Sequence, residues 1–161
     1  MPTLPDTGRF WLFKSEPTTF SFDDLRSSPR KRTHWDGVRN FQARNLLRDE
    51  IKKGDGVLFY HSNAKPMGIT GIAKVVKEGY PDHTAFDPGD KHFDKDSDPD
   101  DPRWYMVDIE AVCPIDPMLE RTALQDVAAL DDMMLLRRGS RLSVQPVTKK
   151  EWRTIIKLAG L

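Results

Sequence analysis

The sequence predicts an α+β fold, a small mixed and mostly antiparallel β-barrel with helices at its edges. Segments with the composition of strands recur at irregular spacing, and one long helical pattern interrupts them in the first half of the chain. A chain of 161 residues is long enough for one domain with a real core, and no internal repeat divides it. We therefore expect a single domain over residues 9–161, preceded by a flexible tail over residues 1–8.

The chain begins with a buried strand and a short helix. Residues 9–14 are apolar on both faces, as in a strand buried on both sides. Pro17 ends the pairing because proline lacks a backbone donor. Ser21 and Asp24 have the spacing of a capping box, which predicts a short helix over residues 21–25.

The longer helix and the remaining strands follow a basic loop at residues 30–34. Apolar residues at three- and four-residue spacing predict a helix from about residue 40 to residue 53, and Gly54 is placed to end it. Gly71 indicates a bulge or a close approach within a strand. Further strands are expected at residues 56–61, 69–77, 104–112 and 141–147, with helical spacing at residues 122–130 and a long acidic loop at residues 79–102. A terminal helix begins with a second capping box, formed by Thr148 and Glu151.

Composition excludes several classes of protein. Cys113 is the only cysteine, which excludes an intramolecular disulfide and a cysteine-cluster zinc site. No apolar run approaches the length of a membrane span, and the first residues lack an apolar signal segment. We therefore expect no membrane association, and a cytoplasmic protein, or a nuclear one if the source is eukaryotic.

Charge is balanced overall but unevenly placed. The net charge of zero argues against a protein that binds nucleic acid through bulk charge. Residues 26–53, however, contain nine basic and three acidic residues, whereas residues 82–110 contain ten acidic and three basic ones. Two solvated faces would explain this pattern. The basic segment coincides with a candidate ligand site, and this coincidence favours a polyanionic partner.

No group of residues indicates catalysis or a bound metal. No Ser or Cys stands in a nucleophile context, and a buried unreactive thiol explains Cys113. Acidic residues alternate as at the start of a calcium-binding loop, but Pro99 replaces the required glycine and Tyr105 the closing glutamate. His83 and His92 lack a third partner at metal-ligand spacing. We expect no catalytic residue, no cofactor and no metal.

Aromatic and polar side chains gather at strand ends and at the start of the longer helix. A helix start offers unpaired N–H groups, and an aromatic plane beside it suits the stacking of a nucleobase. We predict a base pocket formed by Lys14, Ser15, Glu16, Trp35, Asp36, Gly37, Val38, Asn40, His61, Ser62, Asn63, Trp104 and Asp108. Phosphate contacts are predicted for Arg30, Lys31, Arg32, Arg39, Arg44 and Arg48. The simpler alternatives are that the two tryptophans belong to the core, that Asn40 only caps the helix and that Asn63 only forms a turn.

Several consecutive blocks resemble the EVE domain family. The blocks occur in the family's order and span nearly the whole chain, from Phe10 to Leu158. They are Phe10 to Pro17, Trp35 to Asn45, Phe59 to Asn63, Tyr80 to Asp82, Trp104 to Ile109, and Arg141 to Pro146. The resemblance implies a PUA-like barrel related to the YTH domain, which binds methylated adenine in RNA. It also implies a pocket for a modified base, with methylated or hydroxymethylated cytosine in DNA proposed for EVE domains.

Similarity to YTH domains implies roles for individual residues. Lys14 and Ser15 match the pair that ends the first strand, and Trp35 matches one wall of the aromatic cage. Trp104 lies in the region that supplies a second wall, and Asn63 matches a polar residue that closes the second strand. YTH domains have further cage aromatics without a counterpart in this sequence, which leaves the identity of the base open.

These observations lead to three hypotheses. The first is a monomeric, non-catalytic reader of DNA or RNA that flips a modified base between Trp35 and Trp104. The second is an enzyme or sensor that acts on a free nucleotide or small metabolite in the same pocket, through Asp108 or His61. The third is a protein-binding module that uses exposed apolar residues in the segment 133–136.

Overall fold

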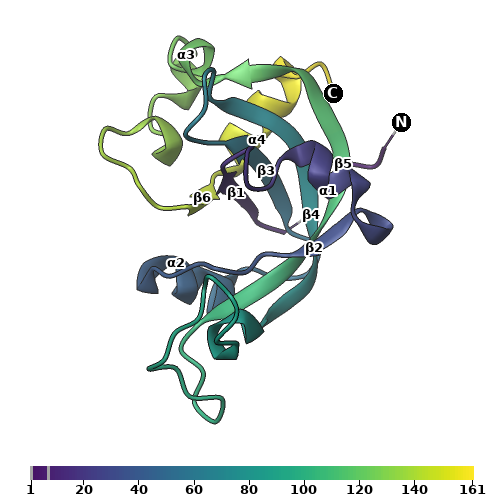
Figure 1. Ribbon diagram of the computed structural model, residues 1–161. Coiled ribbons are helices and arrows are strands. Elements are labelled where there is room, and N and C mark those ends of the chain that lie inside the picture. Colours follow the sequence, from purple (N-terminus) through teal and green to yellow (C-terminus); the bar gives the residue numbers. More distant parts are fainter. Residues whose placement is uncertain (1, 7) are drawn as a thin grey trace.

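The computed structural model describes residues 2–6 and 8–161 and contains one curved six-stranded sheet with helices around it (Figure 1). The strands are β1 (Phe10–Ser15), β2 (Arg32–His34), β3 (Gly56–His61), β4 (Gly68–Pro81), β5 (Tyr105–Glu120) and β6 (Val144–Val147). Their order in the sheet is β2-β5-β4-β3-β1-β6. Only the β1–β3 pair of these neighbours is parallel, and the other pairs are antiparallel. The α+β class with a mostly antiparallel sheet is therefore confirmed.

Four short helices accompany the sheet, namely α1 (Phe22–Ser27), α2 (Phe41–Asn45), α3 (Arg121–Leu124) and α4 (Lys149–Leu158). Both predicted capping boxes are formed. The Ser21 hydroxyl accepts a hydrogen bond from the Asp24 amide, and Thr148 does the same with Glu151, so each helix begins where the sequence predicts.

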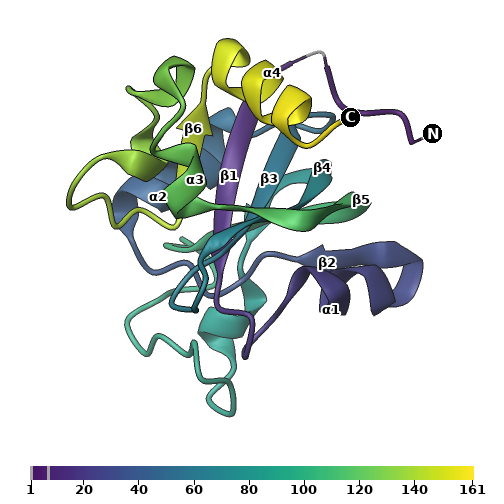
Figure 2. The ribbon, with the colours of Figure 1, turned by 90° about the horizontal axis from the view of Figure 1, so that it is seen from above.

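Two apolar cores lie on the two faces of the sheet, and alternation along β1 supplies both. Trp11 and Phe13 point into the first core, whereas Phe10 and Leu12 point into the second. Helices α1 and α2 cover the first core, and α4 covers the second with Trp152. Figure 2 shows α1 and α4 on opposite sides of the strands.

The predicted helix over residues 40–53 is shorter and less regular than the sequence indicates. Helix α2 ends at Asn45 and continues as a π-helical turn, Leu46–Glu50, which closes with a bond from the Ile51 amide to the Leu46 carbonyl. Gly54 does have a positive φ of 95°, but it lies in the turn before β3 rather than at the end of the helix.

Other segments differ from the prediction in length. Residues 32–34, expected in a loop, form the edge strand β2 because they pair with β5. Strands β4 and β5 extend well beyond the predicted bounds, while the expected helix at 122–130 is reduced to α3 and a 3-10 turn, Ala128–Leu130. Gly71 lies at a register shift, where the Phe22 ring occupies the space that a Cβ atom would need.

Two segments that the sequence predicts to be exposed or flexible pack against the second core. Met133 and Leu135, predicted to be exposed, are only 1% and 3% exposed because they pack in the second core. Leu4 of the predicted tail packs against the same core, and residues 1 and 7 of that tail lie outside the described residues. Within the described part of the chain, no helix has the length and apolar character needed to cross a membrane.

Candidate functional site

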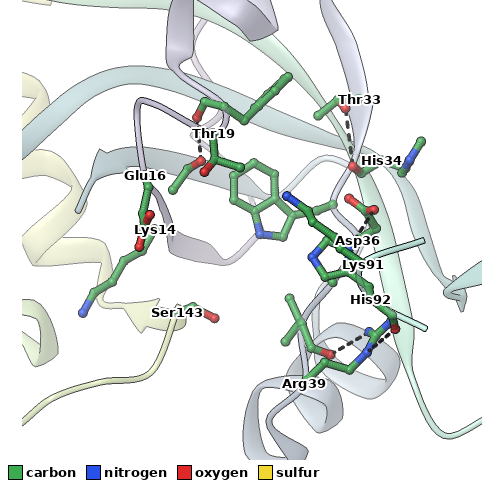
Figure 3. A pocket seen from close by; sticks show the side chains of 15 residues that line it. Lys14, Glu16, Thr19, Thr33, His34, Asp36, Arg39, Lys91, His92 and Ser143 are labelled. Atoms are coloured by element: carbon green, nitrogen blue, oxygen red, sulfur yellow. Dashed lines mark hydrogen bonds and ion pairs between the residues drawn. The ribbon is translucent and has the colours of Figure 1, made fainter. Parts of the chain in front are cut away.

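A cavity of about 550 Å³ opens where β1 and β2 end (Figure 3). Its walls come from segments that are far apart in the sequence. They are Lys14, Ser15, Glu16, Thr19, Phe20, Thr33, His34, Trp35, Asp36, Gly37, Val38, Arg39, Lys91, His92 and Ser143. In Figure 3, Lys14 and Ser143 lie on one side of the cavity, and Asp36, His92 and Arg39 lie on the other.

Trp35 forms a rigid aromatic part of this wall. Its side chain is only 9% exposed, and its ring lies 5.2 Å from that of Phe13 and 5.5 Å from that of Phe59. Its amide donates to the Val107 carbonyl at 2.8 Å, which ties the residue to β5. The ring is therefore fixed before any ligand arrives, and its small exposed area is available for stacking.

A buried carboxylate holds the segment that follows Trp35. Asp82 is fully buried and accepts hydrogen bonds from the Gly37 amide at 2.8 Å, from Arg39 Nη1 at 2.9 Å and from the Thr84 amide at 2.9 Å. Burial on its own would raise the pKa of Asp82, but the bonds from Thr84, Gly37 and Arg39 outweigh it and lower that pKa. The charged carboxylate thus fixes the positions of Gly37 and Arg39 in the wall.

His92 closes the wall from the long acidic loop. Arg39 Nη2 donates to the His92 carbonyl at 2.7 Å, and the His92 ring lies so close to Gly37 that a Cβ atom there would come within 2.5 Å of it. His92 Nδ1 lies 3.6 Å from Asp36 and 3.3 Å from Asp90. These three side chains have ligand atoms within 4.8 Å of one another and could hold a cation, so the expected absence of a metal stays a prediction.

The opposite wall is tied to the loop before β6. The Lys14 amide donates to the Ser143 carbonyl at 2.8 Å, and Lys14 Nζ lies 3.4 Å from the Ser140 carbonyl oxygen. Burial lowers the pKa of Lys14, and the positive charge of Arg121 lowers it further. The two walls therefore differ in charge, with Lys14 in one wall and a carboxylate–imidazole cluster in the other.

The family model of the EVE domain matches residues 9–158. The chain belongs to the EVE domain family. Thymocyte nuclear protein 1 of Gallus gallus is 42% identical over 165 residues, which cover 92% of this chain and 67% of the relative. The crystal structure of the human THYN1 protein in complex with DNA containing 5-methylcytosine matches with a TM-score of 0.89 and 40% identity. The match covers 95% of this chain and 98% of that one.

The fold of this EVE domain protein extends to a more distant group. The YTH domain of the Zygosaccharomyces rouxii MRB1 protein matches with a TM-score of 0.53 at 16% identity, covering 99% of this chain and 91% of that one. At that identity the likeness concerns the fold alone. The PUA-like architecture that the sequence predicts is confirmed.

The cavity brings together seven of the predicted pocket residues of the EVE domain, and the other six do not line it. The seven are Lys14, Ser15, Glu16, Trp35, Asp36, Gly37 and Val38. Asn40 accepts from the Ala43 amide as the cap of α2, and His61 Nε2 accepts from the Phe22 amide. The Ser62 amide donates to the Ser15 carbonyl, and Asn63 donates to Glu16.

Trp104 and Asp108, the remaining two, hold other elements together. Trp104 stacks on Phe41 with ring centres 4.9 Å apart, and its Nε1 donates to Asp94 at 2.7 Å. Asp108 accepts a short hydrogen bond from the Tyr80 hydroxyl. The predicted stacking between Trp35 and Trp104 therefore has no support in this structure, because Trp104 packs on α2 behind the cavity wall.

Most of the predicted phosphate contacts are engaged within the protein. Arg32 pairs with Glu110 at 2.8 Å, Arg39 with Asp82 and Arg48 with Asp49 at 2.7 Å, and Arg44 donates to the Arg103 carbonyl at 2.6 Å. Arg30 and Lys31 occupy an exposed turn with φ of 57° and 58°, and their side chains have no hydrogen-bond or ion-pair partner among the described residues. Of the six predicted phosphate contacts, Arg30 and Lys31 therefore have the fewest side-chain interactions within the protein.

Besides Arg39, which the sequence assigns to the phosphates, seven further residues line the cavity that sequence reasoning did not include in the pocket. They are Thr19, Phe20, Thr33, His34, Lys91, His92 and Ser143. Thr33 and His34 directly precede Trp35, and Ser143 precedes β6, so their places at strand ends were a usable signal. Lys91 and His92 gave no such signal, because the loop that carries them is positioned by tertiary contacts such as the one with Arg39.

Proposed function

We propose that this EVE domain protein is a non-catalytic reader that accommodates one modified base, flipped out of DNA or RNA, in the cavity beside Trp35. A base of the methylated or hydroxymethylated cytosine type is the preferred ligand. The observation that carries the proposal is a cavity of about 550 Å³ with a fixed aromatic ring on one side and carboxylate, hydroxyl and amine groups around it. The relative that was crystallised with 5-methylcytosine-containing DNA supports the same ligand class.

The cavity has the size and chemistry that a base requires. Small-molecule sites typically enclose about 300–1,000 Å³, and the cavity falls within this range. Stacking on an aromatic ring such as Trp35 contributes about 1–3 kcal/mol per base. Cytosine and its 5-methyl derivative present an exocyclic amino donor, and the carboxylate of Asp36, 29% exposed, is available to accept from it.

Binding without chemistry is favoured because the two side chains that the enzyme hypothesis names, His61 and Asp108, are engaged elsewhere. His61 and Asp108 do not line the cavity. His61 accepts from a backbone amide of α1, and burial lowers the pKa of its imidazole. Asp108 accepts from Tyr80, whose pKa burial and this hydrogen bond raise. Both side chains therefore have structural partners that explain their presence.

The test is a titration of the purified protein with labelled oligonucleotides of one sequence, carrying cytosine, 5-methylcytosine or 5-hydroxymethylcytosine at a single position. DNA and RNA, single- and double-stranded, are compared by fluorescence anisotropy. We expect at least about tenfold tighter binding to one modified form, equivalent to about 1.4 kcal/mol. Asp36→Asn should weaken binding of all three oligonucleotides, because the amino group that Asp36 would accept from is common to cytosine and both modified forms, whereas Asp96→Asn on the exposed loop should not.

Equal and weak binding to all oligonucleotides would refute the reader. The alternative, an enzyme or sensor for a free nucleotide or small metabolite, predicts binding of the free nucleotide with similar affinity. Incubation with modified nucleotides and chromatography of the products separates the two, because a reader returns the ligand unchanged. A monomeric state, and a cytoplasmic location or a nuclear one in a eukaryote, stay predictions of the same proposal.

A further inference from the structure

A second group of cations lies beside the cavity, on the side away from Arg39 in the opposite wall. Lys14 is the cavity residue nearest to this group, and Arg121 begins α3 directly after β5. Sheet register places Lys14 and Arg121 at the same end of the strands, because Lys14 pairs with Tyr60, His61 with Gly68, and Gly68 with Glu120. The ends of β1, β3 and β5 therefore lie at the same end of the sheet, and of these three only the end of β1 lines the cavity.

The loop before β6 adds two more cations to the same edge. The bond from the Lys14 amide to the Ser143 carbonyl holds this loop against β1, and Ser143 itself lines the cavity. Arg138 and Arg141 are exposed in this loop, within five residues of Ser143 along the chain. In Figure 3 the amino group of Lys14 points away from Asp36 and His92.

These cations differ from Arg32, Arg39 and Arg48 of the first basic segment, which pair with carboxylates. Within residues 2–6 and 8–161, no carboxylate lies within 4.0 Å of the charged groups of Lys14, Arg121, Arg138 or Arg141. Arg121 also acts on its neighbours, since its charge lowers the pKa of Lys14 after the effect of burial. Like charges that face each other without a counter-ion are stabilised by a bound anion.

We propose that Lys14, Arg121, Arg138 and Arg141 form the surface that contacts the phosphates of the strand whose base enters the cavity. Lys14 contacts the phosphate of the flipped nucleotide, because it belongs both to the cavity wall and to this surface. Arg121 and the loop arginines contact the phosphates next to it. The proposal rests on the reader function, since it assigns the backbone contacts of the same complex.

The assignment replaces the six predicted contacts of the first basic segment, between Arg30 and Arg48, as the phosphate contacts. Phosphate contacts fix the register of a nucleic acid and carry no base information, so their loss weakens binding to all sequences alike. Each contact contributes about 0.9 to the slope of log K against log salt for a duplex and about 0.7 for a single strand. Loss of one or two contacts is therefore measurable as a smaller slope.

The experiment measures affinity for the modified and the unmodified oligonucleotide at a series of salt concentrations. The variants are Arg121→Gln and the pair Arg138→Gln/Arg141→Gln, and the matched control is the pair Arg44→Gln/Arg48→Gln. We expect the slope to fall by about 0.7–0.9 for each contact removed. The ratio of affinities for the two oligonucleotides should stay unchanged. The control pair should keep the wild-type slope.

The outcomes separate this surface from the reader function. If the wild type prefers the modified base but neither test variant changes the salt slope, the proposed phosphate surface is refuted and the reader function stands. A smaller slope in the test variants, with no wild-type preference for any base, supports the surface and refutes the reader. A slope that falls only in the control pair, or only in Arg30→Gln/Lys31→Gln, assigns the phosphates to the first basic segment and overturns the proposal.

Discussion

Asp82→Asn tests whether one buried carboxylate holds the cavity wall in place. Oδ2 of Asp82 accepts from the Gly37 amide and Arg39 Nη1, and Oδ1 accepts from the Thr84 amide and hydroxyl. Asparagine has the same shape but only one accepting oxygen. With the NH₂ group beside Gly37 and Arg39, two hydrogen bonds are lost; with it beside Thr84, the bond from the Thr84 amide is lost, while the Thr84 hydroxyl can turn to accept. In both orientations Arg39 loses its counter-ion.

The expected cost follows from burial. Removal of one partner of a buried ion pair costs about 3–5 kcal/mol, and a hydrogen bond to a charged group contributes about 1.5–3 kcal/mol. The side chain of Asp82 is fully buried, whereas that of Arg39 is 23% exposed, so water offsets part of the loss. We expect the free energy of unfolding to fall by about 2–4 kcal/mol at pH 7.

The pH dependence gives the sign of the effect. The folded-state pKa of Asp82 lies below its ordinary value, which is about 3.9 in an unfolded chain. The stabilisation is therefore present in full above about pH 4 and is lost as the pH falls from there through the lower folded-state pKa. The difference between wild type and Asp82→Asn should shrink over the same range.

Urea denaturation followed by tryptophan fluorescence, from pH 7 down to pH 3, measures this difference. Asp96→Asn is the control, because Asp96 lies on the same loop, is exposed and has no side-chain partner among the described residues. The control should change the free energy of unfolding by no more than about 0.5 kcal/mol. A loss below about 0.5 kcal/mol for Asp82→Asn, or a larger loss that does not shrink below pH 4, would refute the reasoning.

Two further substitutions test the aromatic wall and the glycine beside it. Trp35→Ala should lower the free energy of unfolding by about 3–5 kcal/mol, because the ring packs in the core. Trp35→Leu keeps an apolar side chain but removes the aromatic plane, so it should weaken binding of the modified oligonucleotide in anisotropy titrations, with melting curves as the check of folding, and unchanged affinity would exclude stacking on Trp35. Gly37→Ala should reduce both stability and affinity, since φ is +79° and the new Cβ atom would come within 2.5 Å of His92. Melting curves and titrations that match wild type would show that His92 moves away freely.

The parts of the fold that could be predicted are those that local chemistry determines. The capping boxes at Ser21 and Thr148 need only residues three apart, and the apolar run of β1 needs only its own composition. The sequence did not indicate β2, because Arg32, Thr33 and His34 lack apolar alternation. They form a strand only because they pair with the exposed edge of β5.

Prediction of the candidate site from the sequence is limited in the same way, to residues whose positions local sequence determines. Lys14, Ser15 and Trp35 could be predicted because strand ends and the segment before a helix are common positions for ligand contacts. Trp104 has the right chemistry, but its direction depends on Phe41, on which it stacks, and no local pattern contains that contact. His92 was considered only as an isolated metal ligand, although its distance from Asp36 is 3.6 Å.

The uneven charge along the sequence does not correspond to two separate solvated faces of the folded protein. The basic segment 26–53 and the acidic segment 82–110 pair with each other, through Arg32 with Glu110 and Arg39 with Asp82, across 78 and 43 residues of sequence. The strongest clusters of opposite charge therefore neutralise each other when the chain folds. Positive charge without an ion-pair partner among the described residues remains at Arg30 and Lys31, and also at Arg121 and in the loop before β6. A protein with a net charge of zero can thus present a local cationic surface to a polyanion, and only the folded structure indicates where that surface lies.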